Sequence, residues 1–118
     1  MKQEFKVIAD LLPNNTRVLD VGCGDGSLMN FLVKEKNIET RGLELDQNNV
    51  QECIYKGLTV IQGNAETELY QFPDQSFDYR LIYVVQKIVY ILPNYDLNQD
   101  NHEKKNHFHQ FFRHLIIM

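Results

Sequence analysis

A mostly apolar segment that runs directly into three closely spaced glycines constrains the fold of this chain more than any other feature. The segment is Arg17–Val21, and Gly22, Gly24 and Gly26 follow it with G-x-G-x-G spacing. Apolar residues at helical spacing come next and predict a helix that runs to about Lys36. A glycine-rich turn between a strand and a helix lets the backbone approach a ligand, because no Cβ stands in the way. It also aims the free N–H groups of the helix N-terminus at that ligand.

The rest of the chain predicts further strands and helices in alternation. Helices are expected at 5–12 and, after an N-cap at Asp46, at 47–55; strands are expected at 17–21, 40–45 and 58–61 and from 77 onward, with a short turn or helix at 66–70. Strands that alternate with helices at this spacing imply right-handed βαβ crossovers and a parallel sheet. The predicted fold class is therefore α/β, with an incomplete parallel sheet and flanking helices.

Length and charge limit the classes of protein to consider. The 118 residues suffice for one small domain, and the net charge of −4 gives no reason to expect nucleic acid or an anionic membrane as partner. No apolar run approaches the roughly 18 residues that span a bilayer, and the N-terminus lacks the apolar stretch of a signal peptide. Two cysteines without a CxxC pair suit a reducing compartment. We expect a cytoplasmic protein.

Polar residues follow the first three predicted strands where each strand ends. Asp20 ends the first, Glu44 ends the second, and Asn64 follows the third. A carboxylate at Asp20 suits a cationic amine and would be poorly placed beside a pyrophosphate. Glu44 can accept both hydroxyls of a ribose, and the amide of Asn64 can contact an adenine edge. Because the carboxyl ends of adjacent parallel strands form one crevice, we expect the three to converge.

A competing interpretation is that the chain is a fragment of a nicotinamide-dependent dehydrogenase. Its fingerprint is G-x-G-x-x-G, whereas Ser27 stands here where the third glycine of that pattern would fall. The spacing and the position of Asp20 therefore favour a ligand that carries an amine.

With these residues in place, the sequence resembles the class I S-adenosylmethionine-dependent methyltransferases, which have a Rossmann-like fold, and within them the MetW family of methionine biosynthesis. The resemblance covers residues 17–79. It is carried by Arg17–Leu28, Arg41–Asp46, Gly57–Glu66 and Phe72–Tyr79, of which the second and third blocks favour MetW. Asn64 stands where the family usually has Asp.

The resemblance implies that the chain binds S-adenosyl-L-methionine and supports homoserine O-acyltransferase, a possible partner. A non-enzymatic partner of that acyltransferase and a generic methyltransferase fragment are the alternatives. No catalytic residue is predicted, because the acceptor-binding half is not recognisable. The predicted cofactor-binding residues are Asp20, Gly22, Cys23, Gly24, Gly26, Glu44, Leu45, Asn64 and Ala65.

The composition changes near residue 80. Residues 80–118 lack Gly, Ala, Ser, Thr and Cys and carry five basic and three acidic side chains, whereas the acidic residues predominate before them. We therefore expect residues 1–79 to be the N-terminal half of a methyltransferase-like domain. We expect 80–118 to be a divergent segment. It is either the translation of a shifted reading frame, or unrelated sequence joined to a truncated gene, or a region with an amphipathic helix at 108–116.

The cysteines and histidines have plainer explanations than chemistry. Cys23 is a small residue tolerated between glycines, and Cys53 is a helix residue that packs on the sheet. The four histidines, which include the His107-x-His109 pair, have only Glu103 nearby as a carboxylate. We therefore predict no metal site.

Overall fold

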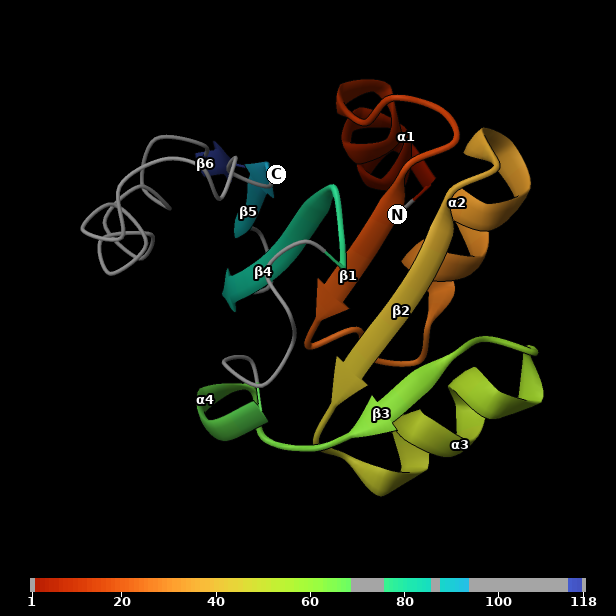
Figure 1. Cartoon of the computed structure of the whole chain (residues 1–118), viewed down its shortest axis with the longest axis vertical. Coiled ribbons are helices and arrows are strands. Elements are labelled where there is room, and N and C mark those ends of the chain that lie inside the picture. The colour runs from red at the N-terminus through yellow and green to blue at the C-terminus, as the bar shows by residue number, and fades with distance from the viewer. Residues whose placement is uncertain (1, 69–75, 86–87, 94–114, 118) are drawn as a thin grey trace.

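The computed structural model describes residues 2–68, 76–85, 88–93 and 115–117 of the chain. In this part the elements are α1 (Lys2–Leu11), β1 (Arg17–Val21), α2 (Ser27–Lys36), β2 (Glu39–Glu44), α3 (Gln47–Tyr55), β3 (Val60–Gln62), α4 (Ala65–Glu68), β4 (Tyr79–Val85), β5 (Ile88–Pro93) and β6 (Leu115–Ile117) (Figure 1). The α/β class predicted from the sequence is confirmed. No helix in the described ranges is long and apolar enough to cross a membrane.

The strands form one sheet with the order β3-β2-β1-β4-β5-β6. β1 pairs in parallel with both β2 and β4, and β2 pairs in parallel with β3. The strand order reverses direction at β1, so the carboxyl ends of β1 and its neighbours border a crevice of the kind that binds ligands in open α/β sheets. The last two strands depart from the expected parallel sheet, because β5 runs antiparallel to β4 and β6 antiparallel to β5.

Helices α1, α2 and α3 cover one face of the parallel part of the sheet (Figure 1). The main core lies between that face and the first two helices; its buried members are Ile8, Ala9, Leu12, Val18, Leu28, Leu32, Ile38, Leu81 and Ile91. A smaller cluster lies on the opposite face, where Ala65 of α4 packs on Leu19, Val21, Leu43 and Phe77. The alternation along β1 explains this division, because successive side chains of a strand point to opposite faces.

Hydrogen bonds near their first residues determine where α3 and α2 begin. Asp46 caps α3 with its carboxylate, which accepts hydrogen bonds from the backbone N–H groups of Asn48 at 2.8 Å and Asn49 at 3.2 Å. α2 starts differently, because its N-cap is Gly26 in the left-handed conformation with φ +83°. There the carboxylate of Asp25 accepts from the N–H of Ser27 at 3.0 Å and from its hydroxyl at 2.6 Å.

The chain beyond residue 79 contributes to the sheet. Tyr79–Val85 forms β4 beside β1, and the next described segment forms β5. The amphipathic helix expected at 108–116 lies mostly outside the described residues, and the part of it that the structure includes, from Leu115 onward, is strand β6 rather than helix. The apolar run of Leu115–Ile117 is compatible with either element, and pairing with β5 favours the strand.

Candidate functional site

The glycine-rich turn Gly22–Gly26 lies between the carboxyl end of β1 and the start of α2. Its three glycines all have positive φ, with values of +76° for Gly22, +60° for Gly24 and +83° for Gly26. Residues other than glycine rarely adopt this conformation, because their Cβ meets the following backbone. The spacing that marks the turn in the sequence is therefore a requirement of its backbone path.

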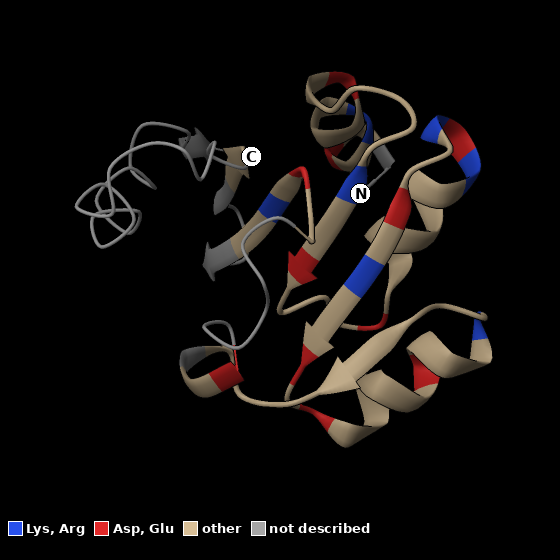
Figure 2. Ribbon diagram, viewed as in Figure 1, with Lys and Arg blue, Asp and Glu red and all other residues tan. Residues whose placement is uncertain are grey.

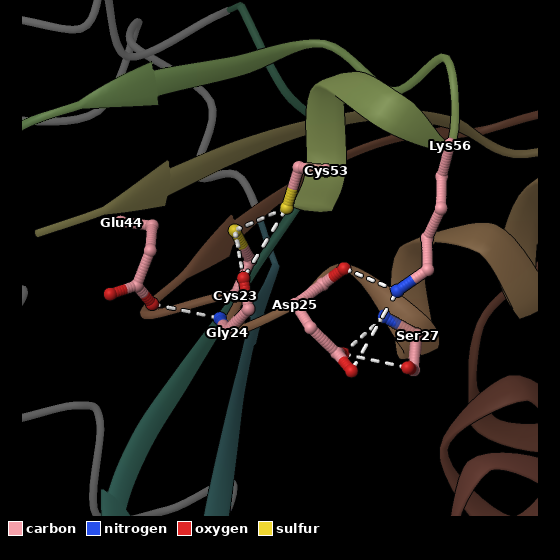
Figure 3. Close-up of polar contacts among 7 residues, drawn as sticks. All are labelled: Cys23, Gly24, Asp25, Ser27, Glu44, Cys53 and Lys56. Atoms are coloured by element: carbon pink, nitrogen blue, oxygen red, sulfur yellow. Dashed lines mark hydrogen bonds and ion pairs between the residues drawn. The ribbon is translucent and has the colours of Figure 1, made fainter. Parts of the chain in front are cut away.

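Two neighbouring elements hold this turn in place. On one side the N–H of Gly22 donates to the carbonyl of Leu43 in β2 at 2.7 Å. On the other side Lys56, which follows α3, donates from its Nζ to the carbonyl of Asp25 at 2.7 Å and lies 3.7 Å from the carboxylate of the same residue (Figure 3). The hydrogen bonds from Ser27, followed in importance by Lys56, lower the pKa of Asp25. The turn is thus pre-formed by protein contacts alone.

Glu44 links the end of β2 to the turn. Its Oε1 accepts a hydrogen bond from the N–H of Gly24 at 2.8 Å (Figure 3), and its Oε2 accepts from the N–H of Asp46 at 2.8 Å. A carboxylate has about four acceptor positions, so each oxygen keeps capacity for a ligand hydroxyl. Glu44 is half-buried at the carboxyl end of β2.

Asp20 is the most unusual residue of the site. Its side chain is fully buried, and neither carboxylate oxygen has a hydrogen-bond partner among the described residues. Burial, followed by the nearby charge of Glu44, raises the pKa of Asp20 from 3.8 to about 7. A buried carboxylate without a partner costs several kcal/mol, which is typical of a position that is completed by a ligand.

The remaining predicted residues lie at the ends of β2 and β3. Leu45 directly follows β2 and is 64% exposed, so its side chain can form an apolar wall against a ligand. Asn64 is exposed at the start of α4, where its backbone carbonyl accepts from the N–H of Glu68 at 2.8 Å, and Ala65 is the first residue of that helix. The N–H of Gly63 donates to the carbonyl of Glu44 at 3.0 Å, which ties the two strand ends together.

The structure thus brings all nine predicted residues to one edge of the sheet. Acidic side chains gather there, at the carboxyl ends of β1 and β2 and at the start of α3 (Figure 2). This charge suits a cationic ligand. The contribution of α3 and of the residue after it was not predicted from the sequence: Cys53 of α3 and Lys56, which follows that helix, both contact the turn. The only signal for it was the length of helix 47–55, which allows its last turn to reach back to the glycines. The four histidines lie outside the described residues.

A separate cavity of about 330 Å³ lies at the amino ends of the strands, away from the glycine turn. Both arginines of its lining have partners: Arg17 lies 3.5 Å from Asp78, and the guanidinium of Arg41 lies over the ring of Phe77, 5.9 Å from its centroid. The carboxyl ends of the strands remain the better candidate, because the carboxylate of Asp20 lies there without a hydrogen-bond partner in the part of the chain that the structure describes.

Known proteins resemble the chain at two levels. One family model, described as methionine biosynthesis protein MetW, matches residues 2–95. The match is longer than the residues 17–79 that carry the resemblance in the sequence blocks, and it includes β4 and β5. No curated protein sequence matches this chain significantly.

Solved structures share the fold. An SAM-dependent methyltransferase from Geobacter sulfurreducens in complex with S-adenosyl-L-homocysteine is 23% identical with a TM-score of 0.50, and the match covers 55% of this chain and 30% of that one. A TehB-like SAM-dependent methyltransferase from Corynebacterium glutamicum is 22% identical with a TM-score of 0.53, over 65% and 41% of the two chains. The YcgJ protein from Bacillus subtilis is 23% identical with a TM-score of 0.56, over 68% and 37%. The chain thus spans less than half the length of each of these proteins.

Proposed function

The chain belongs to the family of methionine biosynthesis protein MetW, and from that premise we propose that it binds S-adenosylmethionine at the carboxyl ends of β1, β2 and β3. The buried, unpartnered carboxylate of Asp20 is the observation that carries the proposal. The ammonium group of the methionine moiety would supply the missing partner, directly or through one water molecule, once ligand binding opens a path to the carboxylate oxygens, which the surrounding protein covers in this structure.

The other parts of the crevice fit the same ligand. The free acceptor positions of Glu44 suit the two ribose hydroxyls. A Cβ at Gly22 or Gly24 would meet open space, so a ligand can approach the backbone of the turn closely at these two positions. Leu45 and Ala65 offer apolar contacts, and Asn64 a polar one, to the adenine. The bound molecule would supply an electrophilic methyl group, and the residues named here bind and orient it.

We propose further that the protein acts in methionine biosynthesis by supporting homoserine O-acyltransferase in the cytoplasm. Membership of the family supports the biosynthetic setting. The alternative within this proposal is that the chain acts on the acyltransferase as a non-enzymatic partner. Co-purification with the acyltransferase, without methyl transfer to any acceptor, would favour the partner; methyl transfer in the same preparation would favour the enzyme.

Calorimetric titration of the purified chain with S-adenosylmethionine tests the binding proposal. Asp20→Ala and Glu44→Ala should each weaken binding by about tenfold to a hundredfold, the effect of a lost hydrogen bond to a charged group. Glu52→Ala is the matched control, because Glu52 is an exposed carboxylate on α3 outside the crevice. Equal affinity for the wild type and both site variants would show that the site is wrongly assigned, and no binding by the wild type would refute the function.

A further inference from the structure

The two cysteines of the chain meet beside the glycine turn. Cys23 belongs to the turn and Cys53 to α3, thirty positions apart in the sequence, yet their sulfur atoms lie 3.9 Å apart (Figure 3). Both thiols are buried, with exposed fractions of 7% for Cys23 and 0% for Cys53. They form an apolar cluster with Met29, against which Leu58 and Val60 pack.

Two glycines create the space in which the sulfurs meet. A Cβ at Gly26 would lie 2.9 Å from the sulfur of Cys53 and 3.6 Å from its Cα. A Cβ at Gly42 would lie 2.6 Å from the sulfur of Cys23. Both sulfur distances are shorter than a van der Waals contact, so any larger residue would force the thiols away. The backbone of α3 therefore lies directly against the turn at Cys53.

The thiols also contact the carbonyl of Gly24, the residue whose N–H binds Glu44. The sulfur of Cys53 donates to the carbonyl of Gly24 at 3.3 Å, and the sulfur of Cys23 lies 3.8 Å from the same oxygen. The N–H of Gly24 donates to Glu44 on the other side. The conformation of Gly24 thus depends both on the carboxylate and on the thiols.

We propose that Cys23 and Cys53 are a redox modification site, at which oxidation to a disulfide distorts the glycine turn and weakens binding of the S-adenosyl ligand. The second half of this statement rests on the proposed function. A disulfide needs the sulfurs to approach by about 1.9 Å, to a bond of about 2.05 Å. It also removes both S–H donors from the carbonyl of Gly24. In reducing compartments such bonds are usually transient and act as sensors.

The oxidant in this proposal is glutathione disulfide. The thiolate of Cys23 attacks one of its sulfurs, forms a mixed disulfide and releases one glutathione thiolate, which takes up a proton. The thiolate of Cys53 then attacks the sulfur of Cys23 and releases the second glutathione. In total two protein thiols and one glutathione disulfide give one protein disulfide and two molecules of glutathione.

Access to the thiols controls the rate of this exchange. Burial is the main cause that raises the pKa of both Cys23 and Cys53, so little thiolate exists while the turn is closed. Exchange therefore proceeds from a conformation in which the turn has opened. A ligand that holds the turn closed should slow oxidation, and the disulfide should in turn disfavour the ligand, because coupling between two sites is reciprocal.

The first experiment needs no ligand. The full chain is equilibrated in glutathione buffers from reducing to oxidising, acid-quenched, and measured by intact mass and peptide mapping. We expect a monomer that has lost the mass of two hydrogens, with one cross-linked peptide pair containing Cys23 and Cys53. A chain that remains reduced throughout, or that ends only as mixed disulfides with glutathione or as disulfide-linked dimers, would overturn the proposal. Cys53→Ala should give only a mixed disulfide at Cys23.

The second experiment measures the effect of the disulfide on ligand binding. Titration with S-adenosylhomocysteine should show at least about fivefold weaker binding to the oxidised than to the reduced chain. The ratio should be one in the double variant Cys23→Ala/Cys53→Ala treated in the same way, because that variant can form neither the disulfide nor a mixed disulfide. A disulfide that leaves the affinity of the wild type unchanged would overturn the coupling. If the reduced chain binds no S-adenosyl ligand, the proposed function fails, whereas the outcome of the mass measurement stands independently.

Discussion

Glu44 accepts the backbone N–H of Gly24 over 2.8 Å and so links the end of the second strand to the middle of the glycine turn. The same carboxylate accepts the N–H of Asp46, at the start of the next helix, with its other oxygen. One side chain therefore fixes two backbone segments that border the crevice. Because these bonds exist without a ligand, the site is pre-organised, which reduces the entropy that binding must overcome.

The first prediction concerns this bond. In Glu44→Ala the N–H of Gly24 loses its acceptor, and its hydrogen exchange should become about tenfold to a hundredfold faster, as expected for a lost bond to a charged group. Amide exchange measured on the ligand-free chain checks this. Glu52→Ala should leave the exchange rate of Gly24 unchanged, and an equal acceleration in both variants would contradict the role assigned to Glu44.

The second prediction concerns the stability cost of Asp20. Its pKa in the folded chain is about 7, above the ordinary value of 3.8, so the folded state binds more protons than the unfolded state between these values. Stability should therefore fall as the pH rises through this range and then level off. The free energy of unfolding of the wild type should fall by about 3 kcal/mol between pH 5 and pH 8 relative to that of Asp20→Asn, because asparagine cannot ionise.

Urea unfolding of the ligand-free wild type and Asp20→Asn at the two pH values measures this difference. Asp10→Asn, which changes an exposed carboxylate of α1, provides the control. Parallel pH dependence of wild type and Asp20→Asn would show that Asp20 is not a strained, ionisable group.

The third prediction compares two glycines with nearly the same φ. Gly26 has φ +83° and no room for a Cβ, which would lie 2.6 Å from Leu58, whereas Gly57 has φ +77° and open space around it. Gly57→Ala should cost only the conformational strain, about 1 kcal/mol. Gly26→Ala should cost about 1–3 kcal/mol more, because it adds overpacking. Free energies of unfolding from urea titration of the two variants test this prediction. Equal losses of stability in Gly26→Ala and Gly57→Ala would contradict it.

Local sequence signals predicted the N-terminal part of the fold well. Arg17–Val21 is a strand with the expected bounds, and Asp46 caps a helix with the predicted bounds Gln47–Tyr55. In both cases the decisive information lies within a few residues: an apolar run before glycines, and an Asp at an N-cap. The convergence of Asp20 and Glu44 followed from the rule that parallel strands present their carboxyl ends at one edge.

Pairings between distant segments could not be predicted in the same way. The strand Ile88–Pro93 is antiparallel to its neighbour, and its apolar run alone does not specify a direction. The contact between Cys23 and Cys53 depends on how α3 packs against the turn, and their separation in the sequence carries no sign of it. That Asp20 has no hydrogen-bond partner among the described residues is likewise a property of packing, visible only once its surroundings are known.

The central claim is that Asp20 pairs with the ammonium group of an S-adenosyl ligand. Calorimetry at pH 8 with S-adenosylhomocysteine, and with its analogue in which hydrogen replaces the α-amino group, tests this claim most directly. The wild type should prefer the amine by about thirtyfold or more, the effect of a charge-assisted hydrogen bond, and Asp20→Asn should lose most of that preference. If both proteins bind the two ligands with the same ratio of affinities, Asp20 does not recognise the amine and the assignment of the site is wrong.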